Sequence, residues 1–281
     1  PIVFILSSLI TIDNLFKFYV SLIVFVLVFI IIFRKFNRKK AMYFINFTYF
    51  IIIVLDILLN GAITKYSILS HDPIIGARYF GIGNEMVGIF LAGIVLNVGL
   101  WLKVYKNKII PVLIMLLSII LVGHPKLGAN VGGTIALLSA SLYFILEMNF
   151  QKLDFKSIFI IIVLILIGIV GLGYIDTVLN PKPTHLGKTL ILIKTKGIGI
   201  VQNIINRKLL MNIKLIGISI WTKVLFTDIL VLSIISYTHE NIIGSLMENG
   251  LGMGILSCIV GSIIGFLVND SGLILAAISI N

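Results

Sequence analysis

Apolar runs of about 20 residues, the length an α-helix needs to cross about 30 Å of hydrocarbon, recur along this chain between short polar connections. Composition agrees with a membrane setting. Of the 281 residues, 59% are hydrophobic and only 12% are charged, whereas roughly 25% are charged in a soluble domain. The sequence lacks the two-residue alternation typical of β-barrel strands. We therefore predict an all-α integral membrane protein, a polytopic helical bundle.

Clusters of lysine and arginine set the predicted orientation of the apolar runs. Five cations lie between Arg34 and Lys40, and such an excess is typical of cytoplasmic connections. Basic residues at 103–108 and 152–156 recur where the chain is expected back on that side. We predict about eight complete transmembrane helices with a partial helix at each end, over residues 15–33, 41–59, 84–102, 109–122, 134–148, 157–174, 223–237 and 242–268.

Residues 1–281 are predicted to form a single transmembrane domain. Pro1 stands inside an apolar stretch with no initiator methionine or basic leader, so we interpret the chain as a fragment or as the membrane part of a longer protein. In the last predicted helix, Glu248 and the glycines that follow it also fit a broken helix.

Four clusters of glycine and polar residues fall on the outer face in this arrangement. They cover residues 76–85, 123–133, 181–188 and 269–272. Glycine lets another chain or a ligand approach the backbone closely, and polar groups near lipid are costly unless they are paired or used. We therefore predict one outward-facing polar site shared by the four clusters.

Three residues of these clusters are predicted to handle protons at a catalytic or coupling step. They are Glu85, His124 and Asp270. A histidine can act as a general base or proton relay, although His124 beside Pro125 is equally an ordinary loop residue. Asp270 fits proton or ion coupling at a helix end, but it also fits a simple helix cap.

Arg78 is the leading candidate for binding an anion, because a guanidinium can hold a phosphate or carboxylate through two hydrogen bonds. A salt bridge from Arg78 to Glu85 or Asp72 is the alternative. The predicted substrate-binding residues share a positive charge or a hydrogen-bonding group, and they are Arg78, Asn84, Lys126, Asn130, His185, Lys188, Arg207, Lys208 and Asn269. Neither a His-x-x-x-His spacing nor a cysteine pair occurs, so no metal and no other cofactor is predicted.

Residues 176–222 form a strongly basic segment that the predicted orientation places outside, against the positive-inside rule. Within it, residues 198–216 carry apolar side chains at helical spacing with cations between them, which predicts an amphipathic helix in the membrane interface. One explanation for this violation is that residues 189–206 dip into the membrane. Another is that the positive charge of the segment binds an anion. We attribute the net charge of +11 to basic residues that attract anionic lipid headgroups. We predict no nucleic-acid partner.

Several motifs together resemble a poorly characterised family of bacterial multi-pass membrane proteins. They lie at residues 72–85, 123–133, 185–188, 207–212 and 268–272. Longer members of that family carry an alkaline-phosphatase-like domain before the membrane part. The resemblance implies a location in the bacterial inner membrane, an upstream soluble domain as partner, and phosphate chemistry of the cell envelope. It supplies no established catalytic residues.

The predicted function is binding, or group transfer, of an anionic and phosphorylated or lipid-linked envelope substrate, with membrane lipids and a polyprenyl-phosphate-type ligand as partners. Two alternatives fit the same sequence. One is a secondary transporter or flippase coupled to protons or ions, and the other is a membrane anchor for an upstream catalytic domain. Whether the protein is an enzyme is left open.

Overall fold

The described part of the chain is mostly helical. The computed structural model describes residues 15–59, 61, 63, 81–150, 155–179, 183, 185–197, 199–239, 244 and 250–281. These residues form eleven α-helices and no strand, which confirms the predicted all-α class. The helices are α2 (Leu15–Phe33), α3 (Arg38–Leu58), α6 (Asn84–Tyr105), α7 (Ile109–Gly123), α8 (Val131–Phe150), α9 (Phe155–Leu179), α10 (His185–Lys196), α11 (Gly199–Ile218), α12 (Ile220–Thr238), α14 (Gly250–Val268) and α15 (Gly272–Ile280).

Six of these helices are long and apolar enough to cross a membrane, which is consistent with a multi-pass membrane protein. They are α2, α6, α8, α9, α12 and α14. Two further apolar stretches, Tyr43–Leu58 of α3 and α7, are shorter. The count of eight complete spans therefore stays a prediction. Each of these eight helices nevertheless lies at one of the predicted spans, although only α2 has the predicted bounds.

Side-chain caps explain where some of these helices begin. Asn107 Oδ1 accepts hydrogen bonds from the backbone N–H of Ile109 at 2.9 Å and of Ile110 at 3.3 Å, at the start of α7. Ser219 accepts one from Trp221 N at 3.2 Å, at the start of α12. Ser219 is the N-cap residue of α12, where Ser is favoured because it satisfies a donor that has no partner within the helix. Asn107, one residue before the N-cap Lys108, satisfies two such donors of α7.

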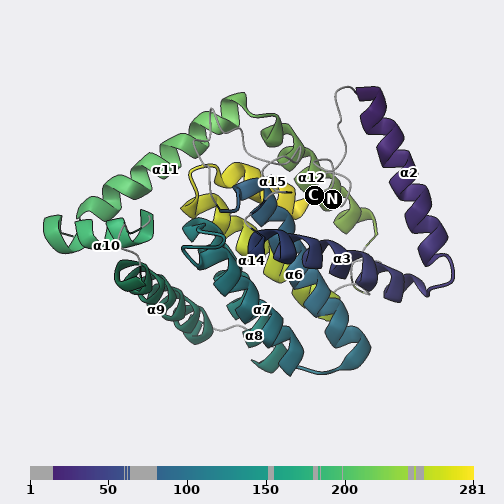
Figure 1. The fold of residues 1–281 in the computed structure, drawn as a ribbon, viewed down its shortest axis with the longest axis horizontal. Coiled ribbons are helices and arrows are strands. Elements are labelled where there is room, and N and C mark those ends of the chain that lie inside the picture. The colour runs from purple at the N-terminus through teal and green to yellow at the C-terminus, as the bar shows by residue number, and fades with distance from the viewer. Residues whose placement is uncertain are drawn as a thin grey trace.

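The core of the bundle is α14, which packs against α8, α6 and α15. Glycines make the contact between α14 and α6 close. A Cβ on Gly99 would overlap the carbonyl oxygen of Gly250, and one on Gly254 would lie 2.6 Å from Val95 O. Backbones approach in this way where small residues line a membrane helix pair. In Figure 1, α6, α14 and α15 accordingly occupy the middle of the molecule.

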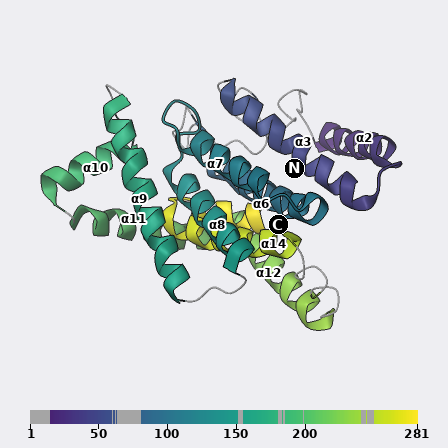
Figure 2. The same cartoon turned by 90° about the horizontal axis from the view of Figure 1, so that it is seen from below.

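Two groups of helices lie at the edges. Figures 1 and 2 place α2 at one side, next to α3, and place α9, α10 and α11 at the other. None of the apolar window of α2 is buried, and only 11% of that of α9 is. On α11 the buried residue is Asn212. The exposed apolar side chains of these helices suit lipid as solvent.

Candidate functional site

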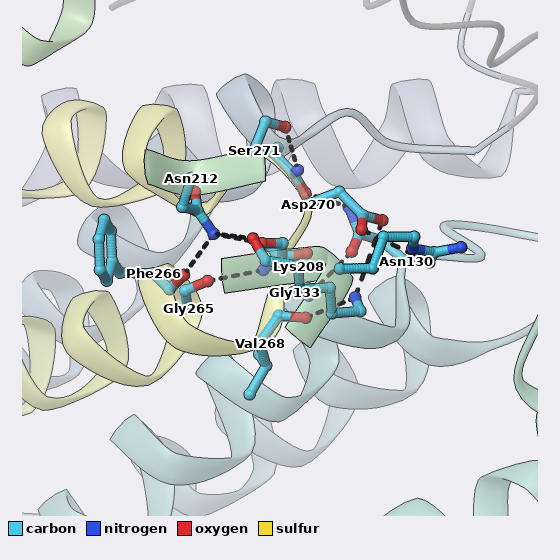
Figure 3. A network of polar contacts seen from close by, with 12 residues as sticks. Asn130, Gly133, Lys208, Asn212, Gly265, Phe266, Val268, Asp270 and Ser271 are labelled. Atoms are coloured by element: carbon cyan, nitrogen blue, oxygen red, sulfur yellow. Dashed lines mark hydrogen bonds and ion pairs between the residues drawn. The ribbon is translucent and has the colours of Figure 1, made fainter. Parts of the chain in front are cut away.

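Three of the four predicted glycine and polar clusters meet at one end of the bundle. The N-termini of α6 and α8 and the turn between α14 and α15 lie there in direct hydrogen-bonding contact. Residues of α11 join them. We call this set the polar junction, defined by Asn84, Asn130, Lys208, Asn212, Asn269, Asp270 and Ser271. Figure 3 shows the contacts around its centre. The side of the membrane that it faces stays a prediction.

The loop before α6 is locked to the loop before α8. Gly81 has a φ of 83°, and a Cβ there would overlap Gly128 O. Ile82 N donates to the same oxygen at 2.8 Å. Glycine is the residue that adopts this left-handed conformation without strain. Gly81 of the first cluster therefore serves close backbone packing.

Asn130 holds the two loops together from inside. It is 1% exposed, and its amide nitrogen donates to Ile82 O and to Asn84 Oδ1, both at 3.0 Å. Its side-chain oxygen accepts from Gly133 N at 2.8 Å, in the manner of a helix N-cap. Both the nitrogen and the oxygen of this buried amide bond to neighbouring protein groups. Asn130 therefore fixes the positions of the two loops from the interior of the junction.

The turn between α14 and α15 joins the junction through two side chains. Asn84 Nδ2 donates to Ser271 Oγ at 2.6 Å, so Asn84 bridges two clusters instead of capping its own helix. Asn269 is 4% exposed. Its nitrogen donates to Gly265 O at 3.1 Å, and its oxygen lies where a Cβ on Gly132 would stand. Gly132 therefore lets α8 approach the turn.

Asn212 of α11 makes the most hydrogen bonds to this turn. Its nitrogen lies within hydrogen-bonding distance of Phe266 O at 3.0 Å and Asn269 O at 2.8 Å, and its oxygen accepts from Leu273 N at 3.0 Å. It therefore satisfies backbone groups left over where α14 ends and α15 begins. Asn212 was not among the predicted site residues. Its only signal in the sequence is an amide within the apolar second half of a basic helix, whose first half carries three further amides.

Arg207 and Lys208 form the charged part of the junction with Asp270. Arg207 Nη2 lies 3.6 Å from Asp270 Oδ1, and Lys208 Nζ lies 3.8 Å from Oδ2. Lys208 also donates to Val268 O at 2.6 Å, close to the C-terminus of α14, where a cation is favoured by the helix dipole. The side chains of Arg207 and Asp270 are 66% and 50% exposed. A carboxylate thus lies between two cations at the surface.

Three further predicted residues lie in the first turn of α6 and in the loop between α7 and α8. Glu85 is half-buried in the first turn of α6. His124 Nδ1 accepts from Lys126 N at 3.2 Å, and the His124 carbonyl accepts from Leu127 N and Ala129 N. His124 therefore stabilises its own loop, and its predicted role in proton handling stays a prediction. Lys126 is exposed beside it.

The fourth predicted cluster lies apart from the junction. Both views place α10 at the outer edge of the molecule, at the end of α11 away from α15. There Gly187 N donates to Asp176 Oδ2 at 2.9 Å, and that carboxylate is 1% exposed. Lys188 is exposed on α10. Arg78 lies outside the described residues, and so does the side chain of His185.

The junction presents two cations, Arg207 and Lys208, beside the carboxylate of Asp270. Among the described residues no group of three or more His, Cys, Asp and Glu side chains could hold a metal ion. The guanidinium and ammonium can neutralise a phosphate or carboxylate. The amides of Asn84, Asn130 and Asn269 are engaged with neighbouring protein groups and fix the positions of the elements that carry the charges.

No family model, no curated protein and no solved structure matches this chain. The resemblance to a bacterial membrane protein family therefore stays a prediction from the motifs.

Proposed function

We propose that this protein is a multi-pass membrane protein of the bacterial inner membrane that binds an anionic, phosphorylated or lipid-linked ligand at the polar junction. The observation that carries the proposal is a pair of cations on α11, the exposed Arg207 and the part-buried Lys208, which a carboxylate of the α14–α15 turn approaches at 3.6 and 3.8 Å. Charge-assisted hydrogen bonds are about 2.7–2.9 Å long. Asp270 therefore lies near both cations without a closed charge-assisted hydrogen bond to either, and its single charge offsets one of the two.

The surroundings of the pair support a ligand that is partly embedded in lipid. The junction lies at the end of helices that are long and apolar enough to cross a membrane. On α11 the side chains of Leu210 and Ile213 are 66% and 63% exposed beside the cations. Basic residues next to exposed apolar ones are typical of helices that lie among headgroups. A phosphate on a lipid would meet the cations while its chains stay in hydrocarbon.

Removal of one cation tests the proposal. We expect Arg207→Gln to weaken binding of phosphatidic acid to the full chain in nanodiscs of neutral lipid by about tenfold, because a hydrogen bond to a charged group contributes about 1.5–3 kcal/mol. Lys214→Gln is the matched control, since Lys214 is an exposed cation on the same helix. Equal losses in the two variants would mean general headgroup attraction and would contradict a specific site.

A coupled transporter is the second candidate. The observation that favours it is the break between α14 and α15, which carries Asp270 and is held by side chains of α6 and α11. Transporters place ionisable groups at helix breaks of this kind. Uptake of labelled ligand into proteoliposomes, driven by a proton gradient, would distinguish transport from binding alone.

A further inference from the structure

A seam of aromatic side chains joins α3 to α6 in the interior of the bundle. The rings of Phe50 and Phe90 stack with centroids 5.5 Å apart, and those of Tyr43 and Trp101 lie 5.9 Å apart. Between these two contacts, a Cβ on Gly93 would overlap the ring of Tyr49. Residues four apart share one face of a helix. Position 97, four residues after Gly93 and four before Trp101, therefore lies in the same seam.

Asn97 stands at that position with its amide unused. The residue is 3% exposed. Neither Nδ2 nor Oδ1 has a hydrogen-bond partner within the described structure, and the same holds for the buried Nε1 of Trp101. A buried polar group without a partner costs about 1–3 kcal/mol. Three such atoms on adjacent turns of one helix face indicate a missing partner shared by both side chains.

We propose that Asn97 and Trp101 bind a water molecule between α3 and α6. The unused groups are two kinds of N–H donor and one carbonyl acceptor. One water can accept from the indole and from the amide nitrogen and donate to the amide oxygen. Buried waters in proteins typically make about three hydrogen bonds to groups that otherwise lack partners. On α3, the register of the aromatic contacts brings Asn46 and Phe47 to the level of this water.

The chemistry of the seam selects water over a charged ligand. The flanking side chains of Tyr43, Tyr49, Phe50 and Phe90 carry no charge. A cation would find a single amide oxygen among the three unused groups, and an anion would find only neutral donors to offset its desolvation, which costs several kcal/mol per ion. A water both donates and accepts, and so matches the whole set.

Tryptophan fluorescence tests this site directly, because the chain has two tryptophans and Trp221→Phe leaves Trp101 alone. In that background we expect Asn97→Leu to move the Trp101 emission of the full chain to shorter wavelength, since the indole loses its hydrogen-bonded water. Asn203→Leu makes the same chemical change at an exposed position of α11 and should leave the emission unchanged. An unchanged emission in Asn97→Leu would overturn the proposal.

A second measurement needs no substitution at Asn97 and remains decisive if the leucine variant does not fold. The Trp221→Phe chain is labelled with ¹⁵N-tryptophan in bicelles with deuterated lipid chains. We expect a cross-relaxation signal between the Trp101 Nε1 proton and water. Signals to aliphatic protons alone would show a dry indole and reject the site.

Discussion

In the proposed site, Asp270 would compete with a bound anion for the two cations of α11. Its carboxylate spans Arg207 and Lys208 at distances longer than a closed hydrogen bond, and exposed ion pairs contribute only about 0.2–1 kcal/mol. A ligand phosphate must displace the carboxylate and is also repelled by it. In the proposed site, Asp270 would therefore lower the affinity of the two cations for an anion.

Substitution of Asp270 should therefore strengthen binding. We expect Asp270→Asn to raise the affinity for phosphatidic acid by roughly two- to fivefold, which corresponds to the loss of an exposed pair. Titration of both full chains in nanodiscs measures the two affinities. At higher salt the difference in affinity between Asp270→Asn and the unaltered chain should shrink, because salt screens the exposed charges. Weaker binding in Asp270→Asn would show that the carboxylate assists the ligand instead of competing with it.

Asn130 is the residue on which the shape of the junction depends most. Its buried amide bonds to Ile82, Asn84 and Gly133. Asn130→Ala should lower the free energy of unfolding by about 2–3 kcal/mol, because buried backbone groups lose their partner. Thermal unfolding in detergent measures the change. Asn149→Ala is the control, since Asn149 is exposed and bonds only to its own helix at Ile145 O. An equal loss of stability in the control would contradict this role.

At the scale of elements, α11 is attached to the bundle near its middle. Asn212 is its buried residue, and Lys208 one turn earlier reaches Val268 O. The ends of the helix are exposed. The attachment therefore depends on a few hydrogen bonds instead of a wide apolar contact.

Loss of the Asn212 amide should loosen α11 without unfolding the bundle. We expect Asn212→Leu to speed hydrogen exchange at the backbone amides of α11 and of the α14–α15 turn, while α6 and α8 keep their protection. Mass spectrometry of the exchanging full chain measures this. Asn203→Leu, at an exposed position of α11, should leave hydrogen exchange unchanged in α11 and in the α14–α15 turn. Faster exchange throughout the molecule would instead assign Asn212 to global stability.

The helices could be predicted because their cause is local. The ends of α2 and α7 follow from apolar runs that stop at cations or a glycine-rich turn. The junction contacts have a different origin. Asn84 bonds to residues 46 and 187 positions away, and no periodicity carries that information. The cluster positions could be predicted, whereas Asn212 and the unpartnered Asn97 could not, because each depends on the neighbouring helix.

At the scale of the whole molecule, the junction joins helix ends that must lie on one side of the membrane. With Cys258 replaced, we expect single cysteines at 127 and 270 to react with an impermeant thiol reagent from the same side of intact cells. Both positions flank buried residues of the junction. Labelling from opposite sides would contradict the membrane arrangement proposed above, since a bilayer of about 30 Å separates its faces.

The hydrogen bonds of Asn212 also bear on how the chain is made. The backbone groups exposed between α14 and α15 cannot enter hydrocarbon without a partner. The helix that supplies the partner precedes both of them in the chain, so it has left the ribosome before they do. The Asn212 amide is therefore synthesised before the turn between α14 and α15 to which it bonds. In a rearranged chain with α11 moved to the C-terminus, that turn would be made before the amide that bonds to it.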